Sequence, residues 1–498
     1  MKLSELIREA FLPISADWQD KVEVGKTPFA HQIEDFKYMG SCHRCGIYNE
    51  PGVGKTLPIQ AYGLWRAGNG NRVVYVMPPI LIRQFSQSLD VNFVGARDFI
   101  TCEAFNGNPA QRDKLWAKWE DTTFPNILLV SYVMFVKYYE ALLEKGFNCV
   151  VVDEATAIKS PSSKIHKAVR AFAEDDNGVV LVTGTPIETN VEDAYGFIKI
   201  ITPEAYGSYK NFEYYHVVKY SMFVPSSGKE VYKTQGYSNL AMLHDNLFRQ
   251  ARRVLKSEVS DLPPRLISEY LIDLSPKHMK LYNRMVNERM LEIGDELVDM
   301  TTAQALYQAM QQVLLNPEKF GEAQHDNELF VALDAIIESL EGQKILVYAW
   351  FNASVDTICE RYKHLNPAKI NGSVTGDNRE NEKQRFISDG GCKMLVANPK
   401  SGGVGVDGLQ HVCSHVVYAE ICPFVGTFQQ SVDRLHRTGQ KSESVNVYLL
   451  VANHTVSVKL RNDLIKKDAY QELAMKDKRS ILSDLMGEEG IKGSLDTI

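Results

Sequence analysis

Short apolar runs, each bounded by polar or turn residues, recur in two sets along the chain. The first set is RVVYVMPP from Arg72, NILLVSY from Asn126, CVVVDEA from Cys149 and VVLVTGTP from Val179. The second set is KILVYAW from Lys344, KMLVAN from Lys393, HVVYAE from His415 and VNVYLLV from Val445. Unbroken apolar runs of this kind are typical of strands that are buried on both faces of a parallel sheet.

Helix-like segments, for example residues 80–89, lie between these runs, so the pattern predicts two α/β domains in tandem. Between the two blocks, residues 207–339 carry longer helical patterns, at 282–298 and 302–315. We therefore expect a mainly helical insertion there. From Arg461 the chain is highly charged and helical in pattern, which predicts a C-terminal helical segment.

An aromatic cluster opens the insertion, and it has two interpretations. Its members are Tyr206, Tyr209, Phe212, Tyr214 and Tyr215. Together with Lys210 and Lys219 they could stack on bases. We favour packing around a helical core. The sequence PSSGKEVYKT that follows is suited to a small hairpin.

The composition is that of an ordinary globular protein, with 44% apolar and 23% charged residues among 498 and a formal net charge of -7. No basic field favours nucleic-acid binding by bulk charge, although local Lys and Arg residues can still follow a phosphate backbone. The pair Cys42 and Cys45 has no second pair nearby to complete a zinc site, so we expect reduced thiols. No signal peptide or membrane helix is expected, and we expect a cytoplasmic protein of a prokaryotic or phage-infected cell.

The stretch NEPGVGKT, from Asn49 to Thr56, is typical of a phosphate-binding loop except at its first position, where Asn49 replaces glycine. A loop between a strand and a helix N-terminus presents backbone N–H groups to phosphate. The glycines allow close approach, Lys55 can reach the β- and γ-phosphates, and Thr56 can hold Mg²⁺. We therefore assign nucleotide binding to Gly52, Val53, Gly54, Lys55 and Thr56.

Two adjacent acids, Asp153 and Glu154, follow the apolar run CVVV. A carboxylate at a strand end can hold Mg²⁺ across from Thr56, so Asp153 is the second predicted metal ligand. Glu154 is suited to orient the attacking water. A helix N-cap is the alternative reading of such a pair, but beside a phosphate loop we favour catalysis.

Several further motifs carry a resemblance to a known family. DEAT with GKT, and LVTGTPIETNVEDAYGFIKIITPEAYGS, resemble the Swi/Snf-type ATPases of the superfamily 2 helicases and translocases. The segment RRVLKSEVSDLPPR from Arg252 is similar to the linker between the two lobes of that family. In the second block, INGSVTGDNRENEKQRF, SGGVGVDGLQ from Ser401 and QSVDRLHRTGQ from Gln430 are similar to its later motifs.

The resemblance implies two tandem RecA-like parallel-sheet lobes, ATP and Mg²⁺ as cofactors, and arginine residues that act on the γ-phosphate. By resemblance Arg437 and Arg434 take the finger and sensor roles, and Gln430 belongs to the same motif. Gln32, in TPFAHQIEDF, is similar to the glutamine of the family that reads adenine. An arginine from the second lobe would stabilise transition-state charge and make hydrolysis depend on lobe closure.

The family resemblance also implies sequence-independent binding to duplex or branched DNA, with replication or recombination proteins as partners and a monomeric state. Candidate DNA contacts lie where open α/β sheets place ligands, at the carboxyl ends of strands. They are Ser131, Tyr132, Thr183, Gly184, Ser401, Gly402 and Gly403.

The expected organisation has five parts. They are an N-terminal helix at 1–24, lobe 1 at 25–206, the insertion and linker at 207–339, lobe 2 at 340–460 and a helical brace at 461–498. The favoured function is an ATP-dependent translocase that remodels DNA or protein–DNA complexes in replication, recombination or repair. The alternatives are a helicase that separates single strands of DNA or RNA, a nucleic-acid-binding ATPase switch, and a metabolic P-loop kinase.

Overall fold

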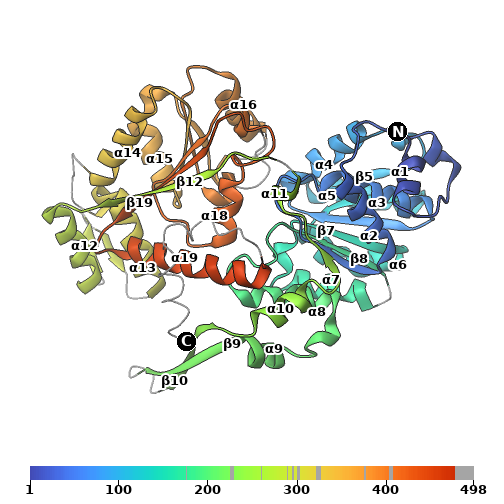
Figure 1. The fold of residues 1–498 in the computed structure, drawn as a ribbon, viewed down its shortest axis with the longest axis horizontal. Coiled ribbons are helices and arrows are strands. Elements are labelled where there is room, and N and C mark those ends of the chain that lie inside the picture. The colour runs from blue at the N-terminus through green and yellow to red at the C-terminus, as the bar shows by residue number, and fades with distance from the viewer. Residues whose placement is uncertain are drawn as a thin grey trace. The chain divides into compact units, whose positions relative to one another are not determined.

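The computed structural model describes residues 1–174, 177–224, 229–259, 261–288, 290–293, 296–299, 303–320, 327–374, 377–402 and 408–476. These residues form two compact units, shown in Figure 1. Unit 1 contains Met1–Ser260 and Leu473–Lys476, and the described part of unit 2 lies within Asp261–Glu472. Each unit is built on its own parallel sheet.

The sheet of unit 1 has seven strands in the order β11-β2-β8-β7-β3-β6-β5, and all of its pairings are parallel. The four apolar runs of the first block form four of its five inner strands, so that prediction is confirmed. The strands are β2 (Arg44–Ile47), β3 (Arg72–Met77), β5 (Cys102–Phe105), β6 (Ile127–Ser131), β7 (Phe147–Asp153), β8 (Gly178–Val182) and β11 (Ala251–Arg252).

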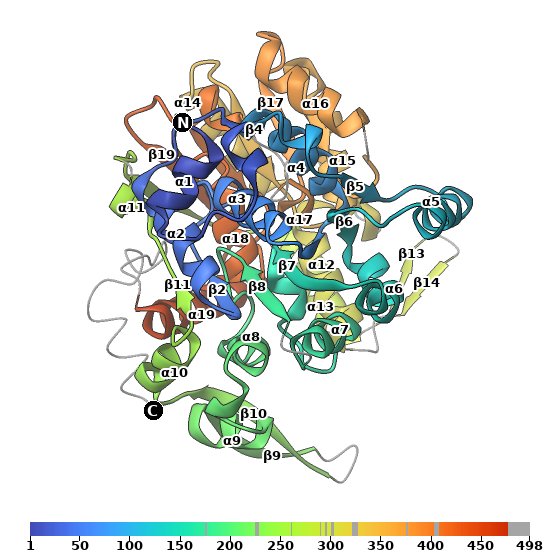
Figure 2. The same ribbon diagram turned by 90° about the vertical axis from the view of Figure 1, so that its right-hand side faces the viewer.

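Helices cover this sheet because alternate strand residues face opposite sides. Val73, Tyr75 and Met77 of β3 pack in one cluster with apolar residues of the first four helices, and the N-terminal segment supplies Leu3 and Leu6 to it. The helices of unit 1 can be followed in Figure 2. They are α1 (Leu3–Glu9), α2 (Ala30–Ser41), α3 (Thr56–Gly68), α4 (Pro79–Asn92), α5 (Pro109–Asp121), α6 (Tyr132–Glu144), α7 (Lys164–Glu174) and α8 (Ala194–Ile201). A short antiparallel pair, β1 (Glu23–Val24) and β4 (Phe93–Val94), lies beside them.

After α8 the chain forms the aromatic segment and the hairpin that the sequence predicts. The elements are α9 (Tyr209–His216), β9 (Val217–Val224), β10 (Lys229–Tyr237), α10 (Leu240–Leu247) and α11 (Lys256–Val259). Core packing is confirmed for Tyr206 and Phe212, which are buried. It is wrong for Tyr214, whose exposed fraction is 83%.

The sheet of unit 2 has six parallel strands in the order β12-β19-β18-β15-β17-β16. The second set of apolar runs supplies four of them, which confirms the second predicted sheet. The strands are β12 (Arg265–Ile272), β15 (Ile345–Tyr348), β16 (Ala368–Ile370), β17 (Met394–Ala397), β18 (His415–Tyr418) and β19 (Val445–Ala452). The helices are α12 (Pro276–Glu288), α13 (Ala303–Leu315), α14 (Glu328–Ser339), α15 (Asn352–Arg361), α16 (Asp377–Ser388), α17 (Pro399–Gly402), α18 (Val425–Val432) and α19 (Val456–Met475).

The helix expected over residues 282–298 is wrong in its second half. The helix α12 ends at Glu288, and β13 (Met290–Ile293) then pairs antiparallel with β14 (Glu296–Asp299). The sequence Gly294-Asp295 between these strands is a two-residue hairpin signal that the helical periodicity obscured. The segment 207–339 is also divided between the units, because β11 pairs with β2 and β12 pairs with β19.

The C-terminal helix begins slightly earlier than predicted, at Val456, and ends at Met475. The rest of the predicted brace, from residue 477, lies outside the described residues. Across the described part of the chain, no helix has the length and apolarity that a membrane span requires.

Candidate functional site

The loop from Asn49 to Thr56 lies between β2 and α3, as the phosphate-loop interpretation requires. Gly52 and Gly54 have φ angles of 91° and 87°, a backbone conformation that favours glycine. Asn49 is not among the described residues with positive φ, so its position does not require glycine. Because α3 begins at Thr56, its N-terminal N–H groups face the loop.

Asn49 has a supporting role that explains why the first glycine of the motif is absent. Its side chain is buried, and its Nδ2 donates to Asp35 Oδ2 on α2. Arg252 of β11 donates to the other oxygen, Asp35 Oδ1, at 3.1 Å. Burial raises the pKa of Asp35, and the nearby Arg252 partly offsets that rise. Asn49 therefore fastens the loop to α2 and to the edge strand of the sheet.

Gln32 contacts the same loop rather than lying exposed. Its Nε2 donates to the Gly54 carbonyl at 2.8 Å, and its Oε1 accepts from the Phe29 N–H at 2.9 Å. A Cβ atom at Gly54 would lie 2.4 Å from Gln32 Nε2, so this contact also requires glycine. The structure thus gives Gln32 a part in shaping the loop, and adenine recognition by Gln32 stays a prediction.

The RRVLK segment also contacts the loop and the residues beside it, which the sequence did not predict. Arg253 Nη1 donates to the carbonyls of Tyr48 and Gly184, the latter at 3.3 Å. The Lys256 N–H donates to Glu50 Oε2 at 2.7 Å. The one sequence feature that could have indicated this contact is the pair of adjacent arginines, which we assigned to the linker between the lobes.

Lys55 and the two acids form the charged part of the site. Lys55 Nζ donates to the carbonyls of Asn49 and Glu50, at 2.9 and 3.1 Å. Asp153 is partly buried at the end of β7, and its Oδ1 accepts from the Glu154 N–H at 3.0 Å. Loss of hydration and the charge of Glu154 raise the pKa of Asp153 to about 7, while Lys55 opposes that rise. Lys55 therefore lies near Asp153, as the predicted site requires.

Glu154 has an unusual backbone, with a φ angle of 50° that side-chain-bearing residues rarely adopt. The Tyr132 hydroxyl lies against the same turn, 2.8 Å from the carbonyl oxygens of both Asp153 and Glu154. Tyr132 therefore positions the two acids, a role the sequence did not suggest. Its contact with DNA stays a prediction.

Thr183 and Gly184, also predicted to contact DNA, pack beneath the phosphate loop. Thr183 is fully buried, and its Oγ1 accepts from the Thr185 N–H at 3.1 Å. A Cβ atom at Gly184 would lie 2.6 Å from Pro51 Cδ, so glycine allows the loop to pack there. This structure shows a packing role for both residues, and their DNA contacts stay predictions.

Ser131 lies at a more open position, where β6 ends and α6 begins. Its Oγ accepts from the Met134 N–H at 3.4 Å as an N-cap. It also lines a pocket of about 400 Å³ at the carboxyl ends of β3, β5 and β6. The other residues lining this pocket include Pro79, Phe105, Asn106, Arg112 and Met134.

In unit 2 the QSVDRLHRTGQ motif occupies the end of α18 and the turn after it. Gln430 lies on α18, and Arg434 and Arg437 follow it, all three partly exposed. Burial lowers the pKa of Arg379 of α16, and the positive charge of nearby Arg434 lowers it further. The turn is held by Gln440, whose Nε2 donates to the carbonyls of Cys413 and Leu435 at 3.0 and 3.1 Å.

Of the three residues predicted in the glycine-rich motif of unit 2, Ser401 and Gly402 end the short helix α17. Gly403 lies outside the described residues. On the same helix, the Lys400 ammonium lies 5.0 and 4.9 Å from the ring centroids of Trp350 and Phe424.

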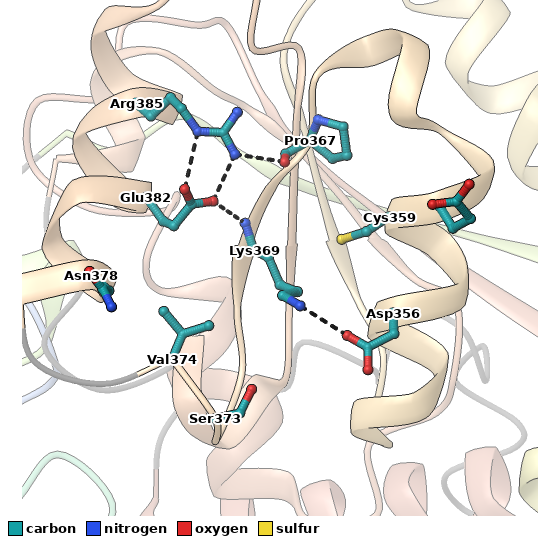
Figure 3. A pocket seen from close by; sticks show the side chains of 10 residues that line it. Asp356, Cys359, Pro367, Lys369, Ser373, Val374, Asn378, Glu382 and Arg385 are labelled. Carbon is teal, nitrogen blue, oxygen red and sulfur yellow. Dashed lines mark hydrogen bonds and ion pairs between the residues drawn. The ribbon is translucent and has the colours of Figure 1, made fainter.

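A pocket of about 680 Å³ in unit 2 contains none of the predicted site residues (Figure 3). Lys369 Nζ lies 3.2 Å from Asp356 Oδ1, and Arg385 Nη2 lies 2.7 Å from Glu382 Oε2. Because these charges already have partners within the protein, we do not assign a charged ligand to this pocket.

Thr56 and Asp153 remain the predicted Mg²⁺ ligands. Among the described residues there is no cluster of three or more His, Cys, Asp or Glu side chains able to hold a metal by themselves. One hydroxyl and one carboxylate fit Mg²⁺ nonetheless, because this ion usually keeps several waters and takes substrate phosphate oxygens as ligands.

Known protein families match both halves of the chain. The SNF2-related domain matches residues 31–320, more than half of the 498-residue chain, and the helicase conserved C-terminal domain matches residues 328–439. An uncharacterized ATP-dependent helicase of Mycoplasma genitalium is 24% identical over 380 residues, covering 74% of this chain and 35% of that protein. The TATA-binding protein-associated factor mot1 of Aspergillus fumigatus is 26% identical over 441 residues, covering 78% of this chain and 22% of that protein.

The chain therefore spans about a third or less of the length of these two relatives. Among solved structures, the SWI2/SNF2 ATPase core of Sulfolobus solfataricus in complex with double-stranded DNA is 20% identical. The match covers 94% of this chain and 97% of that chain, with a TM-score of 0.40.

Proposed function

Because the chain belongs to the SNF2-related domain family, we propose that it is an ATP-hydrolysing motor that moves on duplex or branched DNA. The observation that carries this proposal is the assembly in unit 1, where Lys55, Asp153 and Glu154 meet at a loop with two left-handed glycines. A loop held by hydrogen bonds to α2 and to the RRVLK segment is preorganised for phosphate.

In this proposal the N–H groups of the loop and the Lys55 ammonium bind the β- and γ-phosphates of ATP. Mg²⁺, held by Thr56 and Asp153, would neutralise charge on those phosphates. Glu154 accepts a hydrogen bond from the attacking water and thereby orients it. Tyr132 keeps both acids in place through their carbonyls. Arg437 supplies positive charge to the γ-phosphate as the bond breaks, with Arg434 and Gln430 in supporting roles.

We propose that the protein binds DNA mainly through contacts to backbone phosphates. Such binding is independent of sequence, and its affinity should fall steeply as the salt concentration rises. Ser131 supports this view, because it lines an open pocket at the carboxyl edge of the unit 1 sheet. The motor would remodel DNA or protein–DNA complexes during replication, recombination or repair, in the cytoplasm of a prokaryotic or phage-infected cell, and we propose that it acts as a monomer.

The experiment is steady-state ATP hydrolysis without nucleic acid, then with duplex DNA, branched DNA, single-stranded DNA and RNA. Glu154→Gln serves as the blank. We expect strong stimulation by duplex or branched DNA. Stimulation by single strands or RNA alone would favour a strand-separating helicase, and hydrolysis indifferent to every nucleic acid would overturn the motor proposal.

A further inference from the structure

The hairpin β9–β10 of unit 1 has an anchored base. The Tyr206 hydroxyl and His216 Nε2 lie 2.6 Å apart and are buried, and Asn246 Nδ2 donates to the same hydroxyl at 3.0 Å. On the second strand, the Tyr237 hydroxyl donates to Glu192 Oε2 at 2.5 Å. The two strands then run away from the sheet of unit 1 in both views (Figures 1 and 2). This anchoring fixes the direction in which the hairpin extends.

Beyond that base the described part of the hairpin is exposed to solvent. Every described side chain of residues 219–223 and 230–235 is exposed. Phe223 and Tyr232 are the most exposed of its large apolar residues, at 61% and 64%. Isolated two-stranded ribbons gain little stability of their own, and exposed apolar groups gathered in one place mark interaction surfaces.

The strand register distributes these groups over both faces. Phe223 pairs with Glu230 and Ser221 with Tyr232, so Phe223 and Tyr232 are diagonal neighbours on one face, within reach of each other. On the opposite face Tyr220 pairs with Lys233. Met222 and Val231 form the next pair on that second face. Each face therefore presents aromatic surface.

The charge of the hairpin is opposite to that of the whole chain. Residues 217–237 contain three lysines and one glutamate, against a net charge of -7 overall. Lys219 pairs with Glu213 at 2.5 Å. Lys233, and Lys210 on the neighbouring α9, are exposed and form no ion pair with the described residues. Aromatic surface beside uncompensated lysines complements a polyanion whose flat bases are accessible.

We propose that this hairpin binds unpaired bases, so that the motor engages DNA where a strand has separated from the duplex. Bases inside a duplex are already stacked on each other, and their faces cannot reach aromatic side chains. Two opposite aromatic faces suit a ribbon that lies between two strands at a branch point. The inference rests on the proposed function, since it names the form of DNA that the motor engages.

The test is equilibrium binding of the full chain without ATP. Its probes are a forked DNA with 2-aminopurine in an unpaired arm, the matching single strand and a blunt duplex. The variants are Phe223→Ala with Tyr232→Ala for one face and Tyr220→Ala for the other. Each lost stack should weaken binding to fork and single strand about fivefold or more and reduce quenching of 2-aminopurine, while duplex affinity stays within about twofold.

Phe11→Ala is the matched control, because Phe11 is an even more exposed aromatic residue, at 80%, outside the hairpin. It should leave all three affinities unchanged. Unaltered fork binding by the hairpin variants would overturn the proposal, and so would an equal loss on the duplex. A dimer in solution that these substitutions convert to a monomer would identify a second copy as the occupant and would overturn it too.

This experiment separates the inference from the proposed function, because binding is measured without ATP and hydrolysis is measured on wild-type protein. If hydrolysis ignores nucleic acid while the hairpin still quenches 2-aminopurine, the motor fails and the base-binding surface stands. If DNA stimulates hydrolysis but the hairpin substitutions leave fork binding unchanged, the motor proposal stands and the base-binding proposal fails.

Discussion

In each unit an acidic side chain with a raised pKa lies where an inner strand of the sheet ends, and these two carboxyl groups have different surroundings. Asp153 ends β7 in unit 1, and Glu420 follows β18 in unit 2. Loss of hydration raises the pKa of both carboxyls to about 7. A raised pKa alone therefore does not distinguish a catalytic acid from a structural one.

Their hydrogen bonds do distinguish them. Glu420 accepts from the N–H groups of Trp350 and Phe351 at 2.7 and 3.0 Å, and from the Ser354 hydroxyl at 2.6 Å. These groups belong to the start of α15, so Glu420 satisfies donors that a helix N-terminus leaves open. Among described donors, Asp153 has only the Glu154 N–H, and the charge of Lys55 lies nearby. Glu420 therefore has three hydrogen-bond donors within the protein, whereas Asp153 has one among the described residues.

The largest effect is expected from Arg437→Ala in unit 2. An arginine that stabilises transition-state charge in phosphoryl transfer contributes about a thousandfold or more to turnover. DNA-stimulated kcat should fall by about that factor, while DNA affinity is unchanged. Arg361→Ala is the control, because Arg361 pairs with Asp334 at 2.7 Å on the surface of the same unit. Normal hydrolysis by the Arg437 variant would show that Arg437 of unit 2 takes no part in the reaction.

Glu154→Gln should reduce turnover roughly 100- to 10,000-fold, since a neutral amide orients and polarises water poorly. ATP binding, measured with a fluorescent nucleotide, should remain. Glu144→Gln, at the end of α6, controls for loss of a negative charge. Substantial residual hydrolysis would remove the role assigned to Glu154 and would leave Asp153 as the one acid of the site.

Glu420→Gln tests the structural side of the comparison. With a folded pKa of about 7 against an ordinary 4.5, the folded protein holds a proton that the unfolded chain loses between these values. Stability should therefore fall by roughly 3 kcal/mol as pH rises through that window, then level off. The glutamine variant should lack this part of the decline in urea unfolding at pH 5 to 8.

ATP hydrolysis by Glu420→Gln should stay within about twofold of wild type, because its amide oxygen can still accept from Trp350 and Phe351. A loss of turnover comparable to that of Glu154→Gln would mean that Glu420 also belongs to the chemistry. The comparison between the two carboxyls would then be wrong.

Asn49→Ala should destabilise the protein by about 1–3 kcal/mol, because Asp35 is buried and would lose a donor. Asn49→Gly restores the glycine of the usual motif but not the hydrogen bond, so it should cost a similar amount. Chemical unfolding of both variants measures the loss. A glycine variant as stable as wild type would show that the Asn49–Asp35 bond contributes nothing.

The smallest expected effect is a change with pH in the Mg²⁺ concentration that hydrolysis requires. Below about pH 7 a proton competes with Mg²⁺ for Asp153, so the half-saturating Mg²⁺ concentration should rise by up to about tenfold per pH unit. Hydrolysis measured between pH 6 and 8, corrected for protonation of ATP itself, gives this slope. Glu420→Gln should show the same slope, and a slope absent from wild type would argue against Asp153 as a ligand.

The sequence predicted the parts of the fold that depend on local pattern. Each of the eight apolar runs forms a strand, because burial on both faces leaves a signal that few polar residues interrupt. The strand β11 has only two residues, and it is a strand only because it pairs with β2. The strands β13 and β14 were missed because their apolar residues also fitted a helical period.

The candidate site was predicted where a motif is contiguous and missed where it depends on distant partners. The loop and the two acids were found from the sequence. The contact between Asp35 and Arg252 joins residues 217 positions apart, and no local pattern encodes it. The same holds for Tyr132, whose hydroxyl reaches the acids only because β6 and β7 both flank β3 in the sheet.

The most direct test of the motor itself is displacement of a third strand from duplex DNA. A triplex-forming oligonucleotide is bound at one end of a duplex track, and its release is followed after addition of ATP and Mg²⁺. We predict release that requires hydrolysis, that slows as the track lengthens, and that is lost in Glu154→Gln and Arg437→Ala. DNA-stimulated hydrolysis by the wild-type protein with no release of the third strand would contradict translocation.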